Sequence, residues 1–119
     1  MPRVKRGVTA HRRHKKMLAL TKGQRATRDS LYRRAHEAML KSLTYAYFHR
    51  RERKGDMRRL WISRVNAASR AQGLTYGQFV DGLRKSGVEI NRKMLADMAV
   101  KEPEAFANLV TIAKEKVQG

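Results

Sequence analysis

Apolar residues recur at three- and four-residue spacing along much of this chain, which is the period of an α-helix. The longest such segment covers residues 24–72, contains no proline and one glycine, Gly55, and consists largely of good helix formers. We therefore expect one long helix over residues 24–72. At about 1.5 Å per residue it would be roughly 70 Å long, about twice the diameter of a compact domain of this size. Such a helix either breaks or extends into a partner that surrounds it.

The apolar stripe of this segment changes character near Gly55. Between Leu31 and Tyr47 the stripe is interrupted, and no heptad register lasts beyond two repeats, which argues against a coiled coil. From Met57 to Ala71 the apolar positions repeat regularly, as expected for a helix that packs on a core. Trp61 falls in this stripe, so we expect it in the core rather than at a contact surface.

Three shorter helices are predicted after the long one. Thr75 and Gln78 have the spacing of a capping box, Asn91 is a good cap for the next helix, and Pro103 suits the first turn of the last. With the end of the long helix, these segments predict a small all-α domain over residues 60–119. Its core is near the lower size limit for independent stability.

Most of the net charge lies in the first half of the chain. There are 28 Lys and Arg against 10 Asp and Glu, a net charge of +18, and residues 1–60 contribute +15 of it. No acidic residue precedes Asp29, so the start of the chain should be disordered when free and ordered by a polyanion. We therefore assign residues 1–59 as a basic helical extension. It should contain a short helix over residues 9–20, with Gly7 and Gly23 in turns.

Enzyme chemistry finds little support in the residues. The absence of cysteine excludes disulfides and thiolate metal sites. His11 and His14 could share a metal ion, but no third ligand accompanies them, and their alternative role is solvated or base-stacking histidines. The carboxylates form no acid–base pair, and no phosphate-binding loop is present. Neither a signal peptide nor a membrane span is predicted. We expect a soluble intracellular, non-catalytic protein without cofactor, metal, small-molecule substrate or membrane partner.

Arginine-rich clusters interleaved with aromatic residues favour nucleic acid as the partner. For Tyr45 and Phe48, stacking on bases and packing against protein are equally compatible with the pattern. A long helix with basic residues on several faces suits folded RNA, which can enclose it. The first alternative is an architectural DNA-binding protein, although neither a dimer seam nor a groove-reading helix is evident. A membrane-surface helix is the other alternative, and the scattered arginines argue against it.

A series of motifs along the chain resembles one known family. In chain order, the motifs are Pro2-Arg3-Val4-Lys5-Arg6-Gly7, Arg13-His14-Lys15-Lys16, Lys22-Gly23, Tyr45-Ala46-Tyr47, Arg50-Arg51, Arg53-Lys54, Arg58-Arg59-Leu60-Trp61-Ile62, Arg64, Asn66-Ala67-Ala68, Phe79, Gly82-Leu83, Asn91-Arg92-Lys93 and Leu95-Ala96-Asp97. Across essentially the whole chain they resemble the bacterial large-ribosomal-subunit protein family numbered twenty. Two departures occur, at Gln24-Arg25-Ala26, where the family has aromatics and a glycine, and at Gly55 and Met57.

The resemblance implies a structural constituent of the large ribosomal subunit with an all-α fold, in which a long basic extension precedes a small helical domain. Its implied partners are large-subunit ribosomal RNA and neighbouring large-subunit proteins, in a cytoplasmic or organellar ribosome. It also implies a part in early subunit assembly and, in some members, repression of translation from their own messenger. The residues expected to bind RNA are Arg3, Lys5, Arg6, Arg12, Arg13, His14, Lys15, Lys16, Lys22, Arg25, Arg28, Arg33, Arg34, Tyr47, Arg50, Arg51, Arg53, Lys54, Arg58, Arg59, Arg64, Arg92 and Lys93.

Overall fold

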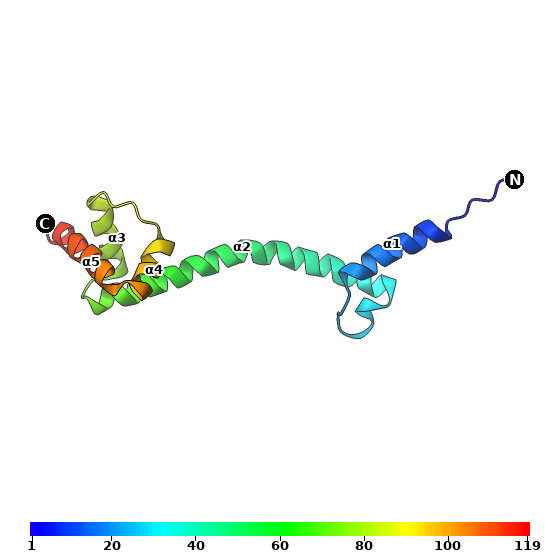
Figure 1. The fold of residues 1–119 in the computed structure, drawn as a ribbon, viewed down its shortest axis with the longest axis horizontal. Coiled ribbons are helices and arrows are strands. Elements are labelled where there is room, and N and C mark those ends of the chain that lie inside the picture. Colours follow the sequence, from blue (N-terminus) through cyan, green and yellow to red (C-terminus); the bar gives the residue numbers. More distant parts are fainter. The chain divides into compact units, whose positions relative to one another are not determined.

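The computed structural model describes residues 1–119 and is all-helical, with 79% of the residues in helices and no strand (Figure 1). This confirms the predicted fold class, a long helix followed by shorter ones. In chain order, the elements are α1 (Gly7–Leu20), the 3₁₀ helix η1 (Ala26–Asp29), α2 (Tyr32–Ala71), α3 (Tyr76–Lys85), α4 (Arg92–Lys101) and α5 (Pro103–Gln118).

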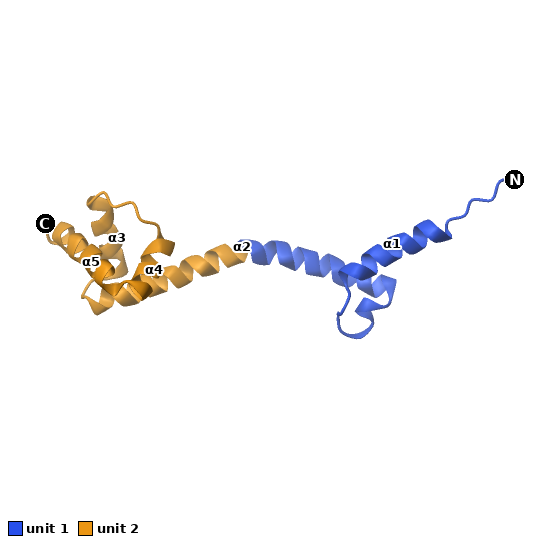
Figure 2. Cartoon of the chain, viewed as in Figure 1, with its two compact units in different colours: residues 1–51 blue, residues 52–119 orange.

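The chain divides into two compact units, Met1–Arg51 and Glu52–Gly119, called unit 1 and unit 2 (Figure 2). The division falls within α2. Unit 1 carries 15 Lys and Arg against 2 Asp and Glu, a net charge of +13. Unit 2 carries 13 against 8, a net charge of +5. The two units therefore differ strongly in net charge.

Unit 2 has a single hydrophobic core. Its centre is the pair Phe79 and Phe106, whose ring centroids are 5.1 Å apart. Trp61 is half-buried and packs against this core. The buried residues of the core are Val65, Leu74, Phe79, Leu83, Leu95, Ala96, Phe106, Val110 and Ala113.

The core-facing stripe predicted for the second half of α2 is wrong where it begins, at Met57 and Leu60. Met57 and Leu60 are 39% and 41% exposed, so they are not part of the core. Packing of α2 against the core begins at Trp61 and becomes complete at Val65. The reason is geometric, because the helices that form the core of unit 2 cover α2 only from Trp61 onward.

The ends of the helices in unit 2 follow local rules that are visible in the sequence. The Thr75 and Gln78 capping box is present, with Thr75 Oγ1 accepting from the Gln78 backbone N–H at 3.4 Å. Asn91 Oδ1 accepts from the Met94 N–H at 2.9 Å and caps α4. Pro103 occupies the first turn of α5. These three predictions are confirmed.

Gly82 lets α3 approach α5 closely. A Cβ atom at this position would lie 2.6 Å from the carbonyl oxygen of Ala113 and 2.8 Å from its Cα. Separations below 3.0 Å essentially never occur for real Cβ atoms. The close approach lets Leu83 on α3 and Val110 on α5 enter the same core.

Unit 1 buries very few side chains. Only Thr21 and Ala35 are buried in it. The ring of His14 on α1 lies 4.1 Å, centroid to centroid, from the ring of Tyr32 at the start of α2. The predicted short helix over residues 9–20 is present as α1, but it begins at Gly7, so the prediction of a turn at Gly7 is wrong. Gly23 does lie in a turn, with φ of +83°.

The predicted helix over residues 24–72 is wrong in its first eight residues. Arg25 is extended, with φ of −64° and ψ of 149°, and Ala26 has φ of +62°. A residue in the left-handed backbone conformation cannot continue a right-handed α-helix, so the hydrogen bonds of the helix cannot continue through Ala26. The chain instead forms η1, and α2 begins only at Tyr32.

Candidate nucleic-acid interface

The basic residues singled out in the sequence lie almost entirely at the surface. Every lysine and arginine of unit 1 is exposed. Of all the residues predicted to bind RNA, only His14 and Arg92 are half-buried. Their positive charge is therefore presented to solvent rather than consumed inside the fold. Exposed charge alone is ordinary, and its meaning depends on whether carboxylates neutralise it.

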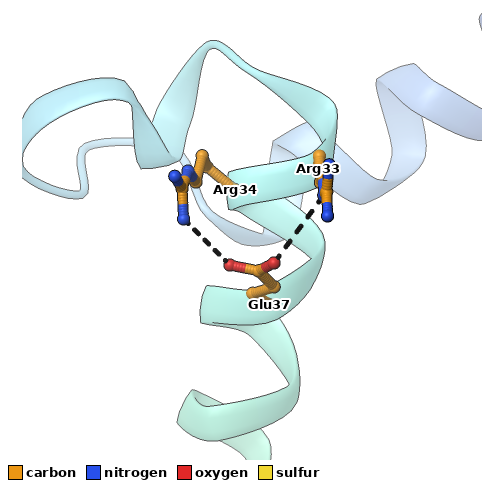
Figure 3. A network of polar contacts seen from close by, with 3 residues as sticks. All are labelled: Arg33, Arg34 and Glu37. Carbon is orange, nitrogen blue, oxygen red and sulfur yellow. Dashed lines mark hydrogen bonds and ion pairs between the residues drawn. The ribbon is translucent and has the colours of Figure 1, made fainter.

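Few carboxylates neutralise these basic side chains. Arg33 and Arg34 share Glu37, with nitrogen–oxygen distances of 4.0 and 3.4 Å (Figure 3). Arg59 lies 3.6 Å from Asp56. These three pairs are exposed and contribute at most about 1 kcal/mol each to stability. The remaining basic residues predicted to bind RNA have no acidic side chain within 4.0 Å.

Exposed aromatic rings accompany the basic side chains in unit 1. Tyr45, Tyr47 and Phe48 are each about half exposed, at 51%, 49% and 52%. Arg51 donates a hydrogen bond of 3.0 Å to the Tyr47 hydroxyl, and the Lys41 ammonium lies 5.1 Å from the centre of the Tyr45 ring. These rings are thus held by neighbours on their own helix and keep a free surface, which suits either a nucleobase or another protein.

An open cavity of about 470 Å³ lies beside the Tyr45 ring in unit 1. It is bounded on one side by Tyr45 and Lys41 of α2 and on the other by Arg28 of η1. Lys41 was not among the residues predicted to bind RNA. Its place beside Tyr45 depends on the helical turn between them, a signal that the i, i+4 spacing contained.

The histidines do not form a metal site in this structure. The ring of His14 packs against that of Tyr32, and the ring of His36, one turn further along α2, lies 6.1 Å from that of Tyr32. No group of three histidine or acidic side chains comes close enough to hold a metal ion. None of the helices combines the length and the apolar character that crossing a bilayer requires.

Unit 2 brings together basic residues from two distant parts of the sequence. Lys54 and Arg58 on α2 face the same open cavity as Arg92 and Lys93 at the start of α4. Sequence reasoning selected these four residues individually, and the fold makes them neighbours. The complete lining is Lys54, Gly55, Arg58, Trp61, Asn91, Arg92 and Lys93.

Three lining residues were missed as site residues. Gly55 was noted as a departure from the family pattern, Trp61 was expected in the core, and Asn91 was expected to cap a helix. For Asn91 a signal was available in its neighbours: Arg92 and Lys93 stand in the first turn of the helix that it caps, where the helix dipole disfavours positive charge, and no acidic residue accompanies them. A stabilising role within the fold would place acidic side chains there.

Comparison with known proteins identifies relatives over nearly the whole chain. The family described as ribosomal protein L20 matches residues 3–109. A protein of Moorella thermoacetica named large ribosomal subunit protein bL20 is 61% identical over 117 residues, which cover 98% of this chain and 97% of the relative. Proteins of the same name from Dehalococcoides mccartyi and Acidithiobacillus ferrooxidans are 61% and 55% identical, covering 90% and 96% of both chains.

Proposed function

The chain belongs to the ribosomal protein L20 family, whose members are structural proteins of the large ribosomal subunit, and we propose that it binds ribosomal RNA there through the basic side chains of unit 1. Its relatives are bacterial, so the proposed location is the ribosome of the bacterial cytoplasm. The proposed role is non-catalytic. Its partners would be the RNA and the neighbouring proteins of the large subunit.

The observation that carries this proposal is the combination of charge and burial in unit 1. It has a net charge of +13 and two buried residues, Thr21 and Ala35. Of its 15 basic residues only Arg33 and Arg34 form ion pairs. Neither an apolar core nor internal ion pairing offsets the repulsion among the other basic side chains of unit 1. A dense array of phosphates would offset it, and folded RNA supplies such an array.

Neutralising phosphates would also explain a role in assembly. RNA segments repel one another until cations lie between them, and side chains fixed on α1 and α2 would supply those cations at set positions. We therefore extend the proposal to an early step of subunit assembly. A messenger that folds to present the same phosphates would compete for the same side chains, which gives self-repression of translation a physical basis.

Salt dependence of RNA binding tests the proposal directly. If about ten phosphates are neutralised, log affinity should fall against log salt concentration with a slope of about −7 to −9. The measurement is a filter-binding titration of the full chain with structured large-subunit RNA. A slope shallower than about −3 would contradict the proposal, and a preference for duplex DNA at moderate salt would favour an architectural DNA-binding protein instead.

A charge-matched pair of variants localises the effect. Replacing Arg50 and Arg51 of unit 1 and the adjacent Arg53 by alanine should make the salt slope shallower by up to about 3 and weaken RNA binding. These residues are exposed, so the thermal transition of unit 2 should stay in place. The control removes the same charge from basic residues outside the predicted set, and it combines Arg70→Ala, Lys114→Ala and Lys116→Ala. Equal losses in both variants would mean that only total charge matters.

A further inference from the structure

The cavity of unit 2 combines positive charge with an aromatic surface. Its volume is about 550 Å³, within the range of roughly 300–1,000 Å³ that small-molecule sites occupy. Its lining contains the four cations Lys54, Arg58, Arg92 and Lys93 and no carboxylate. A ligand for this cavity therefore carries negative charge.

The charges of the cavity are not satisfied within the protein. The neighbouring carboxylate of Asp56 pairs with Arg59 at 3.6 Å, and neither residue lines the cavity. Arg92 is held in position by a hydrogen bond of 2.8 Å from its Nε to the hydroxyl of Tyr76. That contact uses only one of its five N–H groups, so the terminal nitrogens remain able to bind an anion bidentately.

The cavity also offers space beside an indole ring. Trp61 packs against the core, and its half-exposed side chain forms part of the cavity wall. Gly55 lies six residues, about 1.7 helical turns, earlier on the same helix and lines the same cavity, and a Cβ added there would meet no atom within 4 Å. A larger side chain at Gly55 would therefore enter the space of the cavity without a clash. Asn91 uses its Oδ1 to cap α4, so its amide nitrogen is the group that can meet a ligand.

We propose that this cavity binds one unstacked nucleotide of the RNA, with its base against Trp61 and its phosphates on Arg92, Lys93, Lys54 and Arg58. A free phosphate would leave the aromatic wall unused, and an apolar ligand would leave four cations unpaired. A nucleotide uses both features, as in single-strand binding sites that combine aromatic stacking with a basic groove. The inference rests on the proposed RNA-binding function and adds a specific nucleotide site in unit 2.

Trp61 is the only tryptophan in the chain, so its emission reports directly on this cavity. The probe is a short single-stranded oligoadenylate added to the full chain, and we expect saturable quenching of the emission as a base stacks on the indole. Gly55→Leu should fill the space and weaken the affinity measured by quenching by about 5- to 150-fold, the range expected for the loss of one stacked base. Gly55→Ala, which adds a single methyl group, should largely preserve it.

Gly77→Leu is the matched control. Gly77 lies within α3, does not line the cavity, and also has no atom within 4 Å of an added Cβ. The same glycine-to-leucine change there should leave the quenching unaltered. Lys93→Gln provides a second route that does not depend on filling the cavity. Lys93 is exposed, so the fold should tolerate the change, and the salt slope of quenching should become shallower by about 1.

Three results would overturn the inference. The first is quenching by an oligoglutamate peptide, or by an abasic oligonucleotide, equal to that by oligoadenylate. The second is equal quenching in the wild type and Gly55→Leu. The third is RNA binding without any change in emission, when binding is followed independently by the anisotropy of a labelled RNA. That last result would leave the proposed function intact, whereas loss of the anisotropy signal for structured RNA would refute the proposed function itself.

Discussion

Gly82→Ala tests whether the close approach of α3 and α5 holds unit 2 together. The added Cβ would lie 2.6 Å from the carbonyl oxygen of Ala113, while ordinary contact begins at 3.4 Å. The two helices would have to separate by about 0.8 Å at this point. Two of the obstructing atoms belong to the backbone of Ala113 and the third is its Cβ, which has no rotamer, so rotamer changes cannot relieve the overlap.

The expected loss of stability follows from two opposing effects. Overpacking of this kind costs about 3 kcal/mol at the upper end of its usual range. Replacing glycine by alanine within a helix contributes about 1 kcal/mol of stability. The net loss is therefore about 2 kcal/mol, which lowers the melting temperature of a domain of this size by about 8–16 °C. A small core commonly provides only about 3–5 kcal/mol, so the change removes a large share of the total.

Thermal and urea unfolding followed by Trp61 emission measures this effect, because Trp61 packs against the core of unit 2. Gly77→Ala in the same helix is the control. An added Cβ at Gly77 meets no atom within 4 Å, so alanine there should raise stability by up to about 1 kcal/mol. We therefore expect the same substitution to lower the free energy of unfolding at Gly82 and to raise it at Gly77. A neutral or stabilising Gly82→Ala would show that α3 and α5 do not pack as closely as described.

Two further predictions concern α4. Asn91→Ala removes the cap on the Met94 N–H and should lower the free energy of unfolding of unit 2 by about 1 kcal/mol in urea titrations; no change would mean that water replaces the cap fully. The hydrogen bond from Lys101 to Asp97, together with their opposite charges, raises the pKa of Lys101 above its ordinary value of 10.5. Asp97→Asn should return that pKa toward 10.5 in a titration followed by NMR of the lysine Cε. Since the folded pKa exceeds the unfolded one, the stabilisation is complete below pH 10.5 and disappears as the pH rises through the raised pKa, where wild type and variant should converge.

The helix ends of unit 2 could be predicted because each depends on residues close together in the sequence. The Thr75 capping box, the Asn91 cap and the position of Pro103 in the first turn all act over three or four residues. The same local reasoning failed at Ala26. Alanine is a strong helix former, yet here it adopts φ of +62°, a conformation that costs about 1–2 kcal/mol and that no propensity scale would assign to it. Only the turn that follows Gly23 requires it.

The candidate interface was predictable in composition but not in geometry. Basic runs identified Lys54 and Arg58, and the family resemblance identified Arg92 and Lys93, each as a separate position. Their meeting around one cavity depends on how α4 packs in unit 2, which involves residues more than thirty positions apart. Trp61 illustrates the same limit, because the apolar stripe predicted a place in the core, whereas the residue is half-buried, packs against the core and lines a cavity with its other surface.

The scarcity of buried side chains in unit 1 has a consequence for how long the free protein lasts. Fifteen lysines and arginines in 51 residues offer trypsin-like proteases a cleavage point every few residues, on a backbone that little tertiary structure protects. We expect digestion of the isolated chain to begin there and spare residues 60–119. Molecules wrapped in nucleic acid would be shielded. Proteolysis in the cell would then remove copies made in excess of their binding sites, so the amount of the protein would follow the number of those sites without a separate regulator.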